Sequence, residues 1–203
     1  MDDYHAAADP DDRTGGAEFR AGWRLVLAAA CGMGLGLSGL LTYNLGLFAH
    51  DMADGIGLSR ATFGAAIFGA TVAMAAMMPV VGHLVDRFGP RSTAAAGSLM
   101  LCAGFLALSQ ARSATAYVLI LLMIGGLAAT STPVPYTRAV SGAFRKARGL
   151  ALGFTQVGIG LSAAIVPPVI AIVIPRWGWR EGFLALAGLA AIGVVPALLG
   201  LPG

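Results

Sequence analysis

Two long stretches without a charged residue, 61–82 and 93–110, limit the possible folds more than any other feature of this chain. A bilayer core requires about 20 apolar residues of helix, at 1.5 Å for each residue. These stretches therefore predict transmembrane helices and an all-α integral membrane protein. The composition agrees, because 57% of the residues are hydrophobic and only 11% are charged. A soluble domain is usually about a quarter charged.

The polar breaks between the apolar stretches divide the chain into six predicted transmembrane helices. They lie at about 24–48, 61–82, 93–110, 115–138, 149–174 and 181–201, within one domain from residue 23 to 203. Residues 1–20 hold six acidic and two basic residues. A secretory signal would begin with a basic region, so we predict that residues 1–22 form a disordered cytoplasmic tail.

The distribution of arginine and lysine sets the orientation. With the N-terminus inside, nine basic residues lie on the inner side: Arg13, Arg20, Arg24, Arg87, Arg91, Arg138, Arg145, Lys146 and Arg148. The outer loops hold four: Arg60, Arg112, Arg176 and Arg180. This asymmetry follows the positive-inside rule and predicts a multi-pass protein of the plasma (inner) membrane with both termini cytoplasmic. The scarcity of lysine beside abundant arginine, alanine and glycine favours a bacterium with a GC-rich genome.

The remaining composition excludes several classes of function. The net charge of +3 combines an N-terminal tail at −4 with a membrane body at +7, and the body charge is loop arginine. A nucleic-acid partner therefore has no support. Cys31 and Cys102 lie in apolar stretches, where a free cysteine packs as a small hydrophobe. Their spacing fits no metal site, and no cofactor motif is present.

Glycines crowd two of the predicted helices, most clearly the fifth. Gly149, Gly153, Gly158 and Gly160 open that helix. Small residues allow helix backbones to approach closely in lipid, so these glycines predict helix packing. A second interpretation is that some of these contacts slide during a transport cycle.

The turn between the second and third predicted helices carries the most specific motif. It reads Gly82-His-Leu-Val-Asp86-Arg87-Phe-Gly89-Pro-Arg91. Spacing, chemistry and position resemble the signature loop of the major facilitator superfamily, G-x-x-x-D-R/K-x-G-x-R/K. The resemblance implies a cytoplasmic gating loop formed by Gly82, Asp86, Arg87, Gly89 and Arg91. Asp86 would make a charge-assisted contact that breaks as the inner gate opens, and Gly89 would support the sharp turn.

A second motif narrows the resemblance. The segment from Phe144 to Gly153, with Arg148, Gly149 and Ala151, opens the fifth helix. It is similar to the basic-loop-to-helix motif of monocarboxylate transporters and oxalate/formate antiporters. The resemblance implies a small organic anion as substrate, such as a monocarboxylate or dicarboxylate. Gly22-Trp23 matches only part of the acidic Gly-Trp motif of that branch.

The resemblance covers residues 23–202 but only half of the family fold. A full transporter has two six-helix halves with the substrate between them. The chain is similar to an N-terminal half, so a second six-helix half is expected from another copy or another polypeptide. The leading interpretation is secondary transport by alternating access, as antiporter or symporter. The alternative is a truncated or non-transporting half-protein that acts only as an assembly partner.

Polar side chains in the predicted helices are the candidate substrate ligands. Arg138 ends the fourth helix and could pair with a carboxylate, although it could also extend to the membrane interface. The other candidates are Tyr43, Asn44, Thr132, Tyr136 and Gln156. We find no catalytic set. Ser38 lies in a Gly-Leu-Ser-Gly segment that resembles a rhomboid protease motif, but His5, His50 and His83 lie in the tail and loops, away from it.

Overall fold

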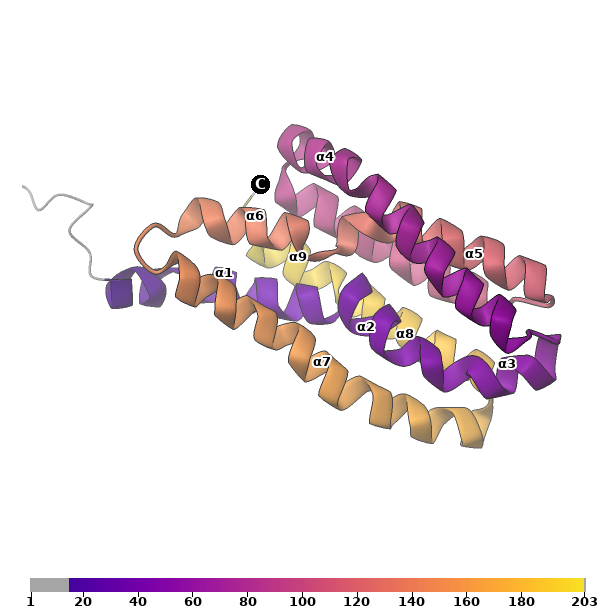
Figure 1. The fold of residues 1–203 in the computed structure, drawn as a ribbon. Helices are drawn as coiled ribbons and strands as arrows, with labels where there is room; N and C mark the ends of the chain where they lie inside the picture. The colour runs from indigo at the N-terminus through magenta and orange to yellow at the C-terminus, as the bar shows by residue number, and fades with distance from the viewer. Residues whose placement is uncertain (1–14, 203) are drawn as a thin grey trace, which may run out of the picture.

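The computed structural model describes residues 15–202, which form a bundle of helices without strands (Figure 1). Five helical stretches within this range are long and apolar enough to cross a bilayer. The second of them, α4 (Arg60–Ser109), turns back on itself at Gly89 and supplies two antiparallel arms. The described part of the chain therefore contains six long helical segments, which we call rods, as the sequence predicts.

The first rod is broken near its middle. It consists of α1 (Gly15–Gly34), α2 (Leu37–Asn44), a 3-10 turn (Leu45–Phe48) and α3 (Ala49–Ile56). The fourth rod is broken in the same way, with α5 (Ala114–Leu127), a 3-10 turn (Ala128–Ser131) and α6 (Pro133–Ala143). The fifth rod is α7 (Arg148–Trp177), and α8 (Trp179–Ile192) with α9 (Val194–Gly200) makes the sixth.

The boundaries differ from the sequence prediction at several places, and α3 and the end of α6 extend the first and fourth rods beyond their predicted ends at residues 48 and 138. Residues 15–22 belong to α1, so the predicted disordered tail was wrong for this part, and residues 1–14 lie outside the described residues. Contacts made by Glu18 and Phe19, described below, hold this first segment in place. The predicted helices 24–48 and 115–138 are each interrupted, at residues 35–36 and 128–132.

The two interruptions meet inside the bundle. The Oγ atom of Ser131 accepts a hydrogen bond of 3.2 Å from the backbone N–H of Leu37, and it donates to the carbonyl oxygen of Ala128 at 2.8 Å. A β-carbon on Gly36 would lie 2.3 Å from the carbonyl oxygen of Ser131. Glycine at position 36 therefore allows the two breaks to touch, and Ser131 satisfies a backbone donor that the break leaves free.

The α1–α7 crossing is also a glycine contact. A β-carbon on Gly34 would lie 2.5 Å from the carbonyl oxygen of Gly158, and one on Gly158 would lie 1.8 Å from that of Ala30. Such close backbone approach is how helices associate in lipid, where bulky apolar side chains gain little by leaving the acyl chains.

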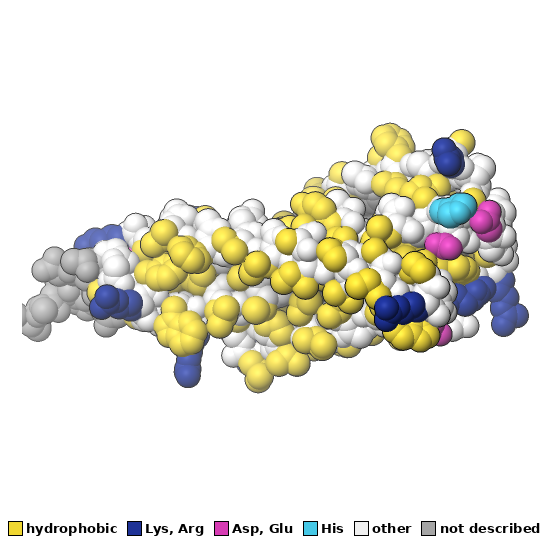
Figure 2. Space-filling view, turned by 90° about the horizontal axis from the view of Figure 1, so that it is seen from below, with side chains coloured by type: hydrophobic (Ala, Val, Ile, Leu, Met, Phe, Trp, Pro, Cys, Tyr) yellow, Lys and Arg dark blue, Asp and Glu magenta, His cyan; other side chains and the backbone are white. Residues whose placement is uncertain are grey.

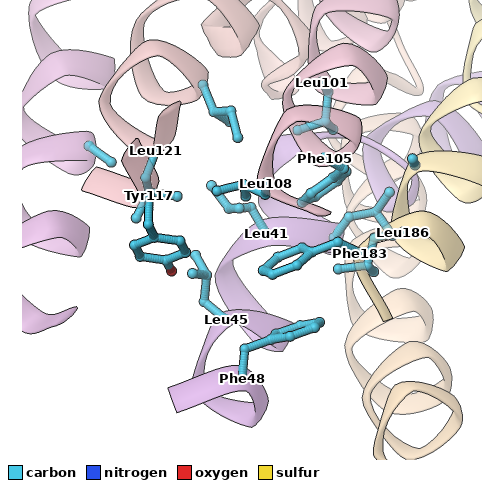
Figure 3. Close-up of a cluster of buried hydrophobic side chains, with 14 of the residues drawn as sticks. Leu41, Leu45, Phe48, Leu101, Phe105, Leu108, Tyr117, Leu121, Phe183 and Leu186 are labelled. Carbon is cyan, nitrogen blue, oxygen red and sulfur yellow. The ribbon is translucent and has the colours of Figure 1, made fainter. Parts of the chain in front are cut away.

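The largest buried cluster joins residues of α2, α4, α5 and α8, and Figure 3 shows part of it. Phe48 stacks on Phe183 of α8 with ring centroids 4.0 Å apart, and Phe105 of α4 packs beside them. The same cluster includes, from α2, α4, α5 and α8, Leu41, Leu101, Leu108, Tyr117, Leu121 and Leu186. These contacts hold the second half of the first rod, the first half of the fourth rod and the second arm of α4 against α8.

Large apolar side chains also cover much of the outside (Figure 2). Charged side chains gather toward the two ends of the face shown in that view. Such an apolar girdle between charged ends suits a bilayer. We call the end that holds the start of α1, the Gly89 turn and the α6–α7 loop the basic end, and the other end the opposite end.

Candidate functional site

The turn at Gly89 is built by one glycine and one threonine. Gly89 has a φ of 79°, a conformation that residues with a side chain rarely adopt. The Oγ1 atom of Thr93 donates to the carbonyl oxygens of Gly89, at 2.8 Å, and of Leu84, at 3.3 Å. Thr93 therefore bridges the two arms of α4 across the turn and fixes the residues just before it.

One of those residues, Asp86, forms an ion pair with Arg138 of α6 through its Oδ1 atom and the Nη2 atom of the arginine. The sequence prediction gave the two residues separate roles, in the gating loop and in substrate binding, and the structure brings them together. The side chains are 56% and 62% exposed respectively. A pair this exposed contributes little to stability, on the order of 1 kcal/mol at most. The pair instead links the position of α6 to that of the Gly89 turn.

The two arginines of the turn, Arg87 and Arg91, differ in their contacts within the described part of the chain. The guanidinium of Arg87 lies 5.3 Å from the ring centroid of Phe88, and both side chains are exposed. Arg91 is exposed, and no ion pair connects it to another described residue. The turn therefore presents two cations outward beside the Asp86–Arg138 pair.

A groove of about 350 Å³ opens between α2, the first arm of α4 and α5. We call it groove B. Its polar lining comes from Ser38, Thr42 and Thr71, and the rest is apolar. Thr71 also lies on the same stripe of α4 as Ala75, Pro79, Gly82 and Asp86, because these positions recur every three or four residues. One face of α4 thus runs from groove B to the ion pair.

Three of the predicted substrate ligands are buried within the bundle. Asn44 is fully buried and donates to the carbonyl oxygen of Leu40 at 2.8 Å. Thr132 donates to the carbonyl oxygen of Ala129 at 2.7 Å. Tyr136 is fully buried, and its ring fills the space beside Gly32. In this conformation Asn44 and Thr132 bond to their own helix backbone, Tyr136 packs in the bundle, and none of the three lines groove B. Their role as substrate ligands stays a prediction.

The other two candidates lie on the outside of the half. Tyr43 on α2 is 50% exposed, and Gln156 on α7 is also exposed. Neither lines groove B. Their role as substrate ligands stays a prediction.

Of the four glycines of α7 that were predicted to pack against another helix, one does so within this half and three have no neighbour. Gly158 packs against α1, as described above. A β-carbon on Gly149, Gly153 or Gly160 would meet nothing within 4 Å. The reason is periodicity, since these three lie on a different side of α7 from the face that meets α1. A β-carbon on Gly64 or Gly82, on the first arm of α4, would also meet nothing within 4 Å.

Sequence reasoning missed the contact that holds the start of α1. The carboxylate of Glu18 accepts hydrogen bonds of 2.7 Å from the backbone N–H groups of Arg145 and Ala147, in the α6–α7 loop. These bonds lower the pKa of the Glu18 carboxyl, which precedes the apolar part of α1. Phe19 packs on Phe144 beside them, at 6.3 Å between ring centroids. We call this arrangement the Glu18 clasp.

A signal for the clasp was present but weak. An acidic residue in the first turn of a helix is common, because it complements the helix dipole. Its partners lie 127 and 129 residues away in the sequence. Thr42 and Thr71 of groove B gave no signal at all, because isolated threonines in a membrane helix usually bond to their own backbone.

Comparison with known proteins gives a consistent result. The family model described as Major Facilitator Superfamily matches residues 21–202. The oxalate:formate antiporter of Oxalobacter formigenes is 32% identical over 145 residues, which are 70% of this chain and 34% of that protein. Monocarboxylate transporter 11 of Mus musculus is 29% identical over 175 residues, 86% of this chain and 39% of that protein.

A third relative is named for a solute other than a small carboxylate. The riboflavin transporter RibJ of Trypanosoma cruzi is 34% identical over 119 residues, which are 58% of this chain and 25% of RibJ. The chain therefore spans well under half the length of each of these relatives.

Proposed function

Because the chain belongs to the major facilitator superfamily, we propose that it is one six-helix half of a secondary transporter that carries a small organic anion by alternating access. The observation that carries the proposal is the Asp86–Arg138 pair at the Gly89 turn. It joins α6 to the turn between the arms of α4, and it lies on the α4 face that leads to groove B. An exposed pair of this kind can be made and broken at small cost.

The substrate class follows from the charges on this side of the molecule. Arg138 pairs with Asp86 on the face of α4 that leads to groove B, and a carboxylate is the natural partner of a guanidinium. A substrate carboxylate would compete with Asp86 for Arg138. Loading of the site would thereby release the turn, which couples substrate binding to movement at the basic end. The names of the antiporter and of the monocarboxylate transporter agree with an anionic substrate.

The second half would dock on the glycines that this half leaves uncovered. Gly64 and Gly82 on α4, and Gly149, Gly153 and Gly160 on α7, have no neighbour within 4 Å of an added β-carbon. Small exposed residues on membrane helices favour close contact with another helix. We call this surface the glycine face. Its partner would be a second copy of the chain or a different polypeptide, and the Lys and Arg asymmetry favours a membrane orientation with the basic end in the cytoplasm.

Uptake into proteoliposomes tests the transport proposal. Radiolabelled oxalate, formate, lactate and pyruvate would be offered to vesicles that hold the chain, the Asp86→Asn variant or the Arg138→Gln variant. We expect saturable uptake of at least one carboxylate by the wild type and its loss in both variants. Arg112→Gln, at the opposite end, is the matched control and should transport normally. Uptake that is unchanged in both variants would overturn the role of the pair. Absence of uptake from a folded protein would instead favour the assembly-partner alternative.

A further inference from the structure

A second groove lies between α1 and α7, on a side of the bundle that the transport proposal does not use. Its volume is about 570 Å³ and its lining is almost entirely apolar. Trp23, Leu27 and Cys31 line it from α1, and Phe154, Leu161 and Ile165 line it from α7. We call it groove A. Leu189 of α8 also borders it, whereas groove B opens beside α4 and α5.

Two arginines continue the groove A stripe of α1 toward the basic end. Arg20, Arg24, Leu27 and Cys31 are spaced by four, three and four residues, so they lie on one face of the helix. Both arginines are exposed, and neither forms an ion pair or hydrogen bond with another described residue. The nearest acidic residue in the described sequence, Glu18, is already bonded to the α6–α7 loop. The end of groove A is therefore positively charged.

The length of the groove matches one leaflet of a bilayer. Its lining on the first rod runs from Phe19 to Leu35, and the part from Trp23 to Leu35 corresponds to about 18 Å of helix. Half of a bilayer core is about 15 Å deep. Trp23 is 51% exposed at the charged end, where a tryptophan is expected to mark the membrane interface. Figure 2 shows a largely apolar surface with basic side chains toward each end.

The residues of α7 indicate that lipid, and not another helix, fills the groove. Phe154, Val157, Leu161 and Ile165 are each more than half exposed along one stripe. The uncovered glycines of the glycine face lie on a different side of the same helix. Small residues favour helix contacts in a membrane, whereas bulky apolar ones lose little by remaining in contact with acyl chains.

We propose that groove A binds an anionic phospholipid, with an acyl chain between α1 and α7 and the headgroup phosphate on Arg20 and Arg24. Arginine is well suited to phosphate because its planar donors can bind two oxygens at once. The Glu18 clasp would favour the site by holding α1 against the α6–α7 loop, and Phe19 contacts Phe154 at 5.4 Å between ring centroids. The proposal does not depend on transport, because it concerns the outer side of the α1–α7 crossing.

Tryptophan fluorescence tests this site directly. Trp177→Phe and Trp179→Phe together would leave Trp23 as the single reporter. The protein would be placed in phosphatidylcholine vesicles that contain increasing fractions of phosphatidylglycerol with brominated acyl chains, or of brominated phosphatidylcholine. Bromine quenches tryptophan on contact, so the two titrations compare occupancy of groove A by the two headgroups. We expect stronger quenching by phosphatidylglycerol, with a preference of about fivefold for each arginine that contributes.

Matched variants locate the preference. Arg20→Gln with Arg24→Gln should reduce it to nearly one, whereas Arg20→Lys with Arg24→Lys should keep most of it. Arg60→Gln with Arg112→Gln removes the same charge at the opposite end and should change nothing. Circular dichroism would establish that each variant is folded. Equal quenching by both lipids in the wild type would overturn the headgroup site. No quenching by either lipid would show that a protein surface covers groove A, and it would overturn the proposal as well.

Discussion

Replacing Gly158 by alanine should destabilise the bundle, because the new β-carbon would lie 1.8 Å from the carbonyl oxygen of Ala30. Real β-carbon contacts are essentially never shorter than 3.0 Å, so α1 and α7 must move apart. The obstacle is backbone and cannot rotate away. Overpacking of this kind costs about 1–3 kcal/mol. Alanine recovers up to about 1 kcal/mol through its higher helix propensity. We therefore expect a net loss of about 1–2 kcal/mol in the free energy of unfolding.

Gly153→Ala is the matched control for this change. It is the same substitution on the same helix, but its β-carbon would meet nothing within 4 Å. We expect no loss, and a gain of up to about 1 kcal/mol. Unfolding in mixed micelles with increasing dodecyl sulfate, followed by circular dichroism, measures both values. If the two variants were equally stable, the close α1–α7 contact at Gly158 would be refuted.

Three further changes test other parts of the structure. Ser131→Ala should cost about 1–3 kcal/mol in the same unfolding assay, because it leaves the buried N–H of Leu37 without its acceptor; an unchanged stability would contradict the meeting of the two helix breaks. Asp86→Asn should change stability by less than about 1 kcal/mol, since the ion pair is exposed, and a much larger loss would show that the pair is structural. Glu18→Gln should weaken the clasp at neutral pH. The pKa of Glu18 is lowered in the folded protein, so its contribution is present above the ordinary value, about 4.3, and is lost as the pH falls through the lowered pKa. The stability difference between wild type and Glu18→Gln should therefore shrink on acidification, and a difference that stays constant with pH would argue against the clasp.

The number of rods could be predicted from the sequence because bilayer thickness sets the length of each apolar stretch, independently of tertiary contacts. The turn at Gly89 was equally local, since a Gly-Pro pair between two apolar stretches indicates it. The break at Gly36 was not local. It depends on Ser131, which is 94 residues away, so nothing near Gly36 distinguishes it from the other glycines of the first helix.

The same limitation applies to the candidate site. Gly153 and Gly158 look alike in the sequence, and only the position of α1 decides which of them is packed. Tyr136 and Gln156 are both polar residues in apolar helices, yet one is buried in the bundle and the other faces outward. Polarity in a membrane helix therefore indicates that a residue needs a partner, but it does not indicate on which side of the helix the partner lies.

Carboxylate uptake by the Gly153→Leu variant tests the central claim most directly. The claim is that this half transports only with a second half docked on the glycine face. A β-carbon at position 153 would meet no described atom within 4 Å, so we expect the variant to fold as the wild type does. Its bulk would hold a docked helix away. We predict wild-type stability together with loss of the uptake that the wild-type chain supports in proteoliposomes. Uptake at the wild-type rate by a Gly153→Leu protein would contradict the account.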